Sequence, residues 1–385
     1  MIAFSMQNEN RSKDMILIID CFKLVKGAGK SIGIYNLALN LVRNLVAEKE
    51  RTTDTKIKNT RILVFGTEHN AKDFAIDGVE FISMKFNPLN KLFCIFWELF
   101  LVSVYAKKYK ADKILYPRGF SSMLHLTKEN IIVHDMIPFY YDKHYPEVFN
   151  KLENFYIMWR LKASIRHCDK VITISQASKQ DILDYTHVNP DKIEVIHNGC
   201  NLISPVKNEK KDYFVAITSA LPHKNAEGIV RSYEAYFKRV SNPLPLKIIG
   251  IADCDAYGLL PEVKEQIECF RYIASNEEMH KLIADANVFL FLSLVEGFGF
   301  PPLEAMQLKT AVICSGISSL PEVVGDAAML VNPEDYEEVA AAMEKLSTDS
   351  MLREELIQKG SGNVKRFAWE EIVKQYWTTL LLEVS

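Results

Sequence analysis

Short apolar runs alternate with longer amphipathic stretches along most of the chain. The apolar runs are rich in Ile, Val, Leu and Phe, as is typical of strands buried on both faces of a parallel sheet. They lie at 15–22, 61–65, 114–117, 130–135, 170–175, 192–196, 213–218, 246–251, 269–274, 288–292 and 310–314. Between them, segments such as 31–47, 276–286 and 369–382 have the spacing of amphipathic helices. The alternation predicts an α/β protein with parallel sheets.

The length of the chain indicates more than one domain. A chain of 385 residues exceeds what one hydrophobic core usually serves. Pro205 and a run of charged residues at about 200–211 read as a linker. We therefore expect a disordered tail at 1–14, a first domain at 15–200, a second domain at 201–365 and a terminal helix at 366–385.

Composition narrows the class of protein. Hydrophobic residues make up 48% and charged residues 25%, as in ordinary globular proteins, and the net charge of -3 gives no reason to expect a nucleic-acid partner. The seven cysteines are scattered without CxxC spacing, which favours reduced cytoplasmic thiols over disulfides or zinc. The first fourteen residues lack the apolar core of a signal peptide. We expect a cytoplasmic protein.

One segment leaves two interpretations open. Residues 92–106 (LFCIFWELFLVSVYA) are strongly apolar but too short to span a bilayer, and they contain Glu98. Flanking lysines together with Trp97 and Tyr105 would suit a helix at the inner membrane surface, whereas a helix packed against the sheet needs no such contact. The buried helix is the favoured interpretation.

The stretch 293–306 carries the most specific pattern. It follows the apolar run 288–292 and contains Gly297 and Gly299, whose freedom allows backbone N–H groups to face a ligand. Pro301 and Pro302 suit the first turn of a helix. Strand, glycine loop and helix N-terminus together form the usual position of an anionic ligand in an α/β sheet.

Two carboxylates bracket this loop. Taken singly, Glu296 could be a solvated loop acid and Glu304 a charge that favours the helix dipole. Together with the sequence Gly-Phe-Gly-Phe-Pro-Pro, they resemble the Glu-x7-Glu signature of the family 4 retaining glycosyltransferases. The resemblance implies a GT-B fold, with two Rossmann-like domains facing a central cleft and a C-terminal helix crossing back to the first domain. It also implies that Glu296 contacts the donor sugar and Glu304 the nucleotide ribose.

The same resemblance assigns further donor residues. A lysine at a helix start opposes the dipole unless it serves an anion, and Lys224 matches the family's diphosphate-binding lysine. His223 stands where the family commonly has arginine. In the first glycine loop, Gly29 and Gly33 could approach the donor, although an ordinary turn is as good an interpretation. Phe298 completes the predicted donor loop.

Acceptor residues are expected after the strand 130–135. The family has a catalytic His near the donor sugar, and His134 is the candidate, with Asp135 orienting its ring or binding the acceptor. Tyr140 and Tyr141 lie in a predicted loop whose polar aromatic side chains suit a sugar. The sequence Asp253-Cys254-Asp255 resembles a metal-binding motif of another glycosyltransferase class but is expected to be a solvated loop.

The prediction is a retaining, metal-independent hexosyltransferase with His134, Lys224 and Glu296 as catalytic residues. It would move mannose, rhamnose, glucose or a similar sugar from a nucleotide-sugar to a hydroxyl of a glycan or glycolipid, in cell-surface polysaccharide or lipopolysaccharide synthesis. No cofactor is expected. Two alternatives stay open: a non-catalytic protein that binds nucleotide-sugars, and a GT-B epimerase.

Overall fold

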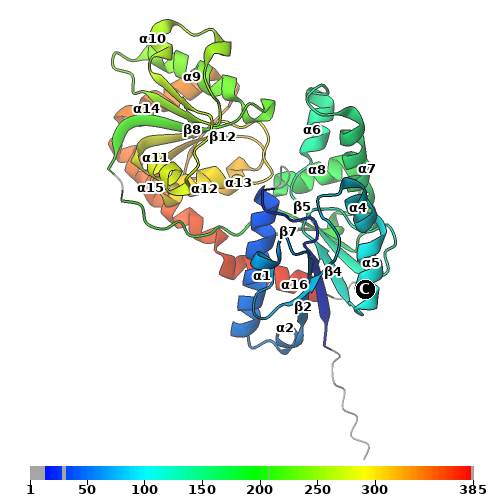
Figure 1. Cartoon of the computed structure of the whole chain (residues 1–385). Coiled ribbons are helices and arrows are strands. Elements are labelled where there is room, and N and C mark those ends of the chain that lie inside the picture. Colours follow the sequence, from blue (N-terminus) through cyan, green and yellow to red (C-terminus); the bar gives the residue numbers. More distant parts are fainter. Residues whose placement is uncertain (1–13, 28–31, 208, 383–385) are drawn as a thin grey trace, which may run out of the picture. The chain divides into compact units, whose positions relative to one another are not determined.

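The computed structural model describes residues 14–27, 32–207 and 209–382. Of the predictions above, the tail (apart from Asp14) and Gly29 lie outside the described residues. The first sheet has the strand order β3-β2-β1-β4-β5-β6-β7 (Figure 1). Its strands are β1 (Ile16–Asp20), β2 (Arg61–Gly66), β3 (Glu80–Ser83), β4 (Lys113–Tyr116), β5 (Lys128–Val133), β6 (Lys170–Thr173) and β7 (Ile193–Val195).

The second sheet has the order β10-β9-β8-β11-β12-β13. Its strands are β8 (Lys211–Ile217), β9 (Leu246–Ile249), β10 (Ile267–Phe270), β11 (Ala286–Phe291), β12 (Ala311–Ser315) and β13 (Met329–Val331). All of its strand pairs are parallel, as are the pairs β1–β2, β1–β4, β2–β3 and β4–β5 of the first sheet. The prediction of parallel α/β architecture is confirmed.

Helices connect the strands in both halves. Those of the first half are α1 (Ile32–Arg51), α2 (Thr55–Asn59), α3 (Ala71–Phe74), α4 (Lys91–Phe96), α5 (Val102–Lys108), α6 (Ile137–His144), α7 (Lys151–His167) and α8 (Gln176–Thr186). Those of the second half are α9 (Ala226–Arg239), α10 (Pro261–Lys264), α11 (Asn276–Asp285), α12 (Phe300–Gln307), α13 (Leu320–Val324), α14 (Tyr336–Thr348), α15 (Ser350–Asn363) and α16 (Trp369–Leu381). Single turns lie at η1 (Trp97–Leu101), η2 (Pro190–Lys192), η3 (Pro222–Lys224), η4 (Asp255–Tyr257) and η5 (Val364–Phe367).

The described chain forms two compact units. Unit 1 contains the described residues up to Ile132, Ala163–Val171 and those from Val373 onward, and unit 2 contains Val133–Lys162 and the described part of Ile172–Ile372. In unit 2 the core lies between the second sheet and its helices, with Leu290, Tyr233 and Met343 all fully buried. Figure 1 shows α9 and α14 on one face of this sheet and α12 and α15 on the other. This division does not test the predicted domain boundaries near residues 200 and 365, which stay predictions.

The last helix returns to the first unit, as expected. From Val373 onward α16 is part of unit 1. The Trp377 indole donates to the Leu45 carbonyl over 3.3 Å, and the Lys113 ammonium donates to the Leu380 carbonyl over 2.8 Å. The α16 segment is thereby joined by hydrogen bonds to both α1 and β4.

The apolar segment 92–106 forms α4, a π-helical turn and α5. Its inner face is core: Trp97 is fully buried and its indole donates to Asp20 over 3.2 Å, while Glu98 pairs with Lys23. On the outer face, Leu92 keeps 80% of its surface exposed. The buried-helix interpretation is confirmed for the inner face. None of the helices in the described ranges has the length and apolar character needed to cross a membrane.

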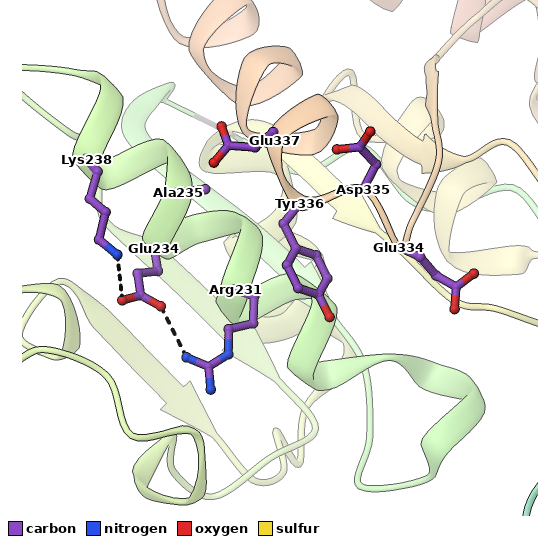
Figure 2. A pocket seen from close by; sticks show the side chains of 8 residues that line it. All are labelled: Arg231, Glu234, Ala235, Lys238, Glu334, Asp335, Tyr336 and Glu337. Atoms are coloured by element: carbon purple, nitrogen blue, oxygen red, sulfur yellow. Dashed lines mark hydrogen bonds and ion pairs between the residues drawn. The ribbon is translucent and has the colours of Figure 1, made fainter.

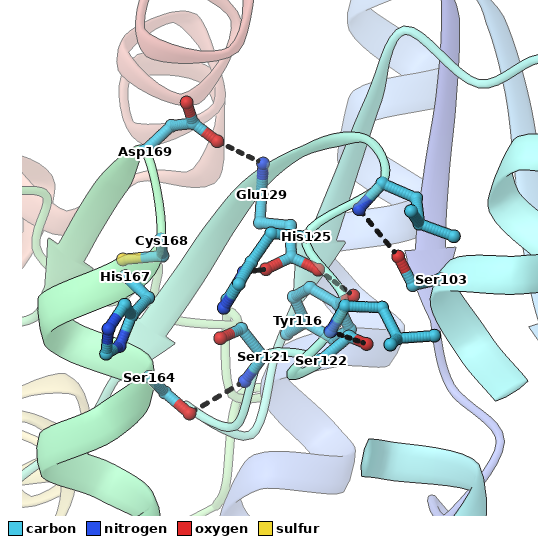
Figure 3. A network of polar contacts seen from close by, with 12 residues as sticks. Ser103, Tyr116, Ser121, Ser122, His125, Glu129, Ser164, His167, Cys168 and Asp169 are labelled. Atoms are coloured by element: carbon cyan, nitrogen blue, oxygen red, sulfur yellow. Dashed lines mark hydrogen bonds and ion pairs between the residues drawn. The ribbon is translucent and has the colours of Figure 1, made fainter. Parts of the chain in front are cut away.

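A buried carboxylate in unit 1 is fully satisfied (Figure 3). Glu129 is 1% exposed and accepts from the Tyr116 hydroxyl over 2.8 Å, while its other oxygen lies 2.6 Å from His125 Nδ1. Ser164 accepts from the Ser121 N–H in the same network. Because buried charge is costly unless paired, this cluster reads as structural support for β4 and β5.

Candidate functional site

The predicted donor loop is held by two hydroxyls that follow β12. The Ser318 hydroxyl accepts from Glu296 N–H over 3.1 Å and donates to the Glu296 carbonyl over 2.9 Å. The Ser319 hydroxyl donates to the Phe298 carbonyl over 2.6 Å. Ser318 has φ of +58°, a conformation that non-glycine residues adopt uncommonly. Neither serine was assigned a role from the sequence, because its partners are backbone atoms more than twenty residues distant.

Gly297 is required by a close approach of backbone. A Cβ at this position would lie 2.4 Å from the carbonyl oxygen of His134 and 3.2 Å from Asp135 Cβ. The loop after β5 therefore lies against the loop after β11, within unit 2. In the described part of the chain, the N–H groups of Gly297, Phe298 and Gly299 donate to no protein acceptor. They remain available for an anion.

Lys224 forms an ion pair with Glu296, the residue that directly precedes Gly297 in this loop. The ammonium lies 2.6 Å from a Glu296 carboxylate oxygen, with side-chain exposures of 26% and 12%. Lys224 belongs to the turn η3, and the next residue, Asn225, anchors that turn by donating to the Leu292 carbonyl over 3.0 Å. The sequence predicted both residues at the donor, and the structure brings them into direct contact.

His223 and Tyr141 share a buried hydrogen bond. The Tyr141 hydroxyl lies 2.6 Å from His223 Nδ1, and the two residues are 1% and 5% exposed. Burial, helped by the charge of Lys224, lowers the pKa of His223 to about 4. His223 is therefore expected to be neutral near pH 7 when no ligand is bound. The predicted loop around Tyr140 and Tyr141 is corrected, because both lie on α6.

Asp135 follows β5 and starts the α6 segment. Its carboxylate accepts from the Ile137 N–H over 3.0 Å. Burial raises the pKa of Asp135, and this hydrogen bond with the charges of His134 and Lys224 partly offsets the effect. The three predicted residues thus lie in one electrostatic neighbourhood, although no proton transfer follows from that alone.

Glu304 lies in α12 with no hydrogen bond or ion pair to its carboxylate among the described residues. Burial raises the pKa of this carboxyl group. A half-buried acid without a protein partner is costly, which favours a ligand that supplies hydroxyl donors. Phe298, by contrast, is 3% exposed and packs against Phe367, so its side chain anchors the loop and only its backbone could reach a donor.

Gly33 lies in the first turn of α1, in unit 1. A Cβ there would meet no atom within 4 Å, so no protein contact requires a glycine at this position. Its predicted contact with the donor remains a prediction.

A pocket of about 230 Å³ adjoins the donor loop in unit 2. Its lining consists of Met136, Tyr140, Ala177, Asp181, Tyr185, Leu294, Val295 and Ser318. Asp181 and Tyr185 were not predicted from the sequence, since an acid and a tyrosine on a helix resemble an ordinary solvated face. The only available signal was their position on the helix that follows a buried strand.

A wider hollow of about 480 Å³ lies elsewhere in unit 2, between α9 and the start of α14 (Figure 2). Three of its charged side chains pair with one another, since Glu234 accepts from both Arg231 and Lys238. Such mutual pairing is typical of a solvated surface.

In the Asp253–Asp255 loop, Asp255 pairs with Lys264. Across the described ranges, no three His, Cys, Asp or Glu side chains gather as metal ligands would.

Comparison with known proteins agrees with this geometry. The family model "Glycosyl transferases group 1" matches residues 202–362, and the model "Glycosyltransferase Family 4" matches residues 59–203. The chain is 32% identical to the O-antigen chain mannosyltransferase RfbU of Salmonella typhimurium over 57% of this chain and 61% of the relative. It is 27% identical to O-antigen chain mannosyltransferase B of Escherichia coli, over 60% and 65% of the two chains. The chain thus spans less than two thirds of the length of both relatives.

Solved structures agree on the fold. Sucrose-phosphate synthase from Thermosynechococcus elongatus, a GT-B protein, has a TM-score of 0.67 and 18% identity, covering 95% of this chain and 98% of that structure. The two family models are consecutive and together account for most of the chain, including the Lys224, Glu296 and Glu304 positions. The chain therefore belongs to the family 4 glycosyltransferases, and its two parallel sheets form the GT-B fold.

Proposed function

We propose that this protein is a retaining glycosyltransferase that moves a hexose from a nucleotide-sugar to a hydroxyl of a glycan or lipid-linked glycan. The observation that carries the proposal is the Lys224–Glu296 pair beside three backbone N–H groups that find no acceptor in the part of the chain that the structure describes. Such a site offers positive charge to a leaving diphosphate and a carboxylate to sugar hydroxyls. The family membership supports the same reaction class.

In this proposal the residues have distinct roles. Lys224 and the N–H groups of the loop stabilise the negative charge that grows on the leaving phosphate. Glu296 holds the donor sugar and Glu304 the ribose. The bond from the anomeric carbon to the phosphate oxygen breaks while the acceptor oxygen bonds to the same face of that carbon. The acceptor's proton passes to the leaving phosphate oxygen, so no carboxylate nucleophile and no metal are required. The His134 segment lies against the loop and would contact the donor sugar.

Mannose is the first donor sugar to test, because both relatives named above are called O-antigen chain mannosyltransferases. That name also supports a role in polysaccharide or lipopolysaccharide synthesis and an acceptor that is a growing glycan. The peripheral membrane contact and the cytoplasmic location stay part of the proposal. The alternatives of a binding protein and an epimerase are less well supported, since no observation favours them over transfer.

The test measures nucleoside diphosphate release from GDP-mannose, UDP-glucose and dTDP-rhamnose with a panel of glycoside acceptors, with and without EDTA. We expect acceptor-dependent release from one donor, unchanged by EDTA, and an NMR-assigned product with the donor's anomeric configuration. Lys224→Ala is the control for catalysis and should lower kcat at least about tenfold. Nucleotide binding without turnover would support the binding protein, free epimerised sugar the epimerase, and an inverted product would contradict retention.

A further inference from the structure

The pocket beside the donor loop is lined by residues that adjoin Glu296. Leu294 and Val295, which form part of its wall, directly precede Glu296 in the chain. Ser318, another wall residue, is hydrogen-bonded to the Glu296 backbone at both its N–H and its carbonyl. Any molecule in this pocket therefore lies next to the residue that is proposed to hold the donor sugar.

Two further lining residues, Tyr140 and Tyr185, carry rings whose positions are fixed by packing. The Tyr185 ring stacks on Phe139 with centroids 4.7 Å apart and an interplanar angle of 26°. The Tyr140 ring lies 4.7 Å from the ring of His144. Aromatic rings held in place offer flat apolar surfaces to a ligand at little cost in conformational entropy.

Asp181 is the charged group of the pocket. Its side chain is half-buried, and no hydrogen bond or ion pair to it is found among the described residues. Burial and the like charges of Asp184 and Asp135 raise its pKa to about 6. A partly buried carboxylate that lacks a protein partner is poised to accept hydrogen bonds from a ligand.

The charges around the pocket limit what it can bind. Asp181 forms part of the pocket lining and Asp135 interacts with it electrostatically, whereas the nearby cation Lys224 is already paired with Glu296. A phosphate or a carboxylate on the ligand would be repelled by the acidic groups. A neutral ring with several hydroxyls has what the lining requires: an apolar face for tyrosine and donors for Asp181.

We propose that this pocket binds one neutral sugar ring, the acceptor's terminal residue, and that Asp181 accepts hydrogen bonds from its hydroxyls and disfavours acidic sugars. The assignment of the ring to the acceptor rests on the proposed transferase function. A volume of about 230 Å³ is smaller than a typical site for a drug-sized ligand, so it suits a monosaccharide rather than a longer glycan segment.

The experiment compares matched neutral and acidic sugars by ligand-observed NMR titration of the full chain with nucleoside diphosphate present. The probes are the methyl glycosides of mannose, glucose and galactose, each paired with the methyl glycoside of its uronic acid. The wild type should bind at least one neutral glycoside about tenfold more tightly than its acid. Asp181→Asn should weaken the neutral sugar about tenfold and bring the ratio near one.

Asp184→Asn is the matched control, because Asp184 is exposed on the same helix and is hydrogen-bonded to Gln180. It should leave both affinities within about twofold of wild type. The proposal is overturned if no neutral glycoside binds, if the acids bind equally well to wild type, or if Asp181→Asn keeps the wild-type ratio. Donor turnover, measured separately, distinguishes the two proposals. Selective sugar binding without turnover would contradict the transferase and not the pocket, whereas turnover with unchanged acceptor preference in Asp181→Asn would contradict the pocket alone.

Discussion

Lys224 and Glu296 form an ion pair of two partly buried residues. They neutralise each other at 2.6 Å, which keeps a partly buried lysine and a partly buried acid satisfied. In the proposed function, an incoming diphosphate would share the ammonium while the carboxylate turns to hydroxyl donors. Glu304 differs, since its carboxylate has no such partner in the described chain, and the proposed ribose contact would supply one.

Glu304→Ala should therefore weaken nucleotide binding without harming the fold. Loss of a charge-assisted hydrogen bond to a ribose costs about 1.5–3 kcal/mol, or roughly ten- to a hundredfold in Kd. Removing an unpartnered acid should leave the free energy of unfolding unchanged or slightly increased. Calorimetric titration with the preferred nucleoside diphosphate, together with urea unfolding, measures both effects. An unchanged Kd would contradict the ribose contact.

The lowered pKa of His223 predicts that the stability of the protein depends on pH. Its folded pKa of about 4 lies below the ordinary value of 6.5, so the unfolded chain binds more protons between those values. The contribution of His223 to the free energy of unfolding is therefore complete above about pH 6.5, and it is lost as the pH falls toward 4. After allowance for solvent screening, the loss is on the order of 1–2 kcal/mol. Urea unfolding at pH 7.5 and 4.5 should show a smaller loss for His223→Asn, which keeps a polar atom near Tyr141 but does not titrate.

The same histidine should stay neutral throughout the range in which activity is measured. The pH dependence of kcat/KM reports the ionisations of the free enzyme. Between pH 6 and 8.5 the titration of His223 should therefore not contribute to it. Equal stability losses in the wild type and in His223→Asn would show that burial does not lower the His223 pKa in the folded protein.

At the scale of elements, the segment α4–η1–α5 separates a structural face from a solvated one. Trp97 is fully buried, stacks on Phe22 with ring centroids 4.4 Å apart, and donates to Asp20 at the end of β1. Leu92 and Phe96 are exposed on the other side. Some apolar side chains of this segment thus pack in the core, whereas others, such as Leu92 and Phe96, are exposed and form what we call the exposed margin.

Substitutions on the two faces should differ in cost. Trp97→Ala should lower the free energy of unfolding by about 3–5 kcal/mol, because it removes a large buried side chain and leaves Asp20 without the indole donor. Leu92→Ser should change it by no more than about 0.5 kcal/mol. Chemical denaturation followed by circular dichroism tests the contrast. If Leu92→Ser abolished flotation of the wild type with anionic liposomes, the exposed margin would be a membrane contact.

At the scale of the whole molecule, the C-terminal helix completes a unit whose other residues lie far away in the sequence. Tyr376, Trp377 and Leu380 are all at most 1% exposed, and Lys113 donates to carbonyls at the end of α16. Unit 1 therefore includes residues that follow the whole second sheet in the sequence. Its stability depends on the packing of this late segment against α1 and β4.

Truncation after residue 372 should destabilise unit 1 selectively. The loss of three large buried side chains and of the Lys113 partners should remove well over about 5 kcal/mol, comparable with the stability of a domain. We expect an early unfolding transition or proteolytic loss of the first sheet, while nucleoside diphosphate still protects the second. Removal of 383–385 alone is the length control. A truncated chain with the wild-type melting profile would show that α16 is dispensable.

The apolar runs, the glycine loop and the two prolines were enough to predict the parallel sheets, the order of most elements and the loop between β11 and α12. These features are local, because a buried strand or a tight turn requires particular residue types at particular spacings. The sequence could not place short strands such as β3 and β13, which lack a long apolar run. It also assigned Tyr140 and Tyr141 to a loop, since their polar aromatic composition masks a helix.

Only the tertiary structure decided which groups meet. The approach of the His134 carbonyl to Gly297, the pairing of Lys224 with Glu296 and the burial of His223 against Tyr141 each join segments more than seventy residues apart. The same packing leaves Asp181 beside the predicted donor loop, with no hydrogen-bond or ion-pair partner among the described residues. Charge, protonation and access depend on distance and on exclusion of water, and a residue's neighbours in sequence carry little of that information.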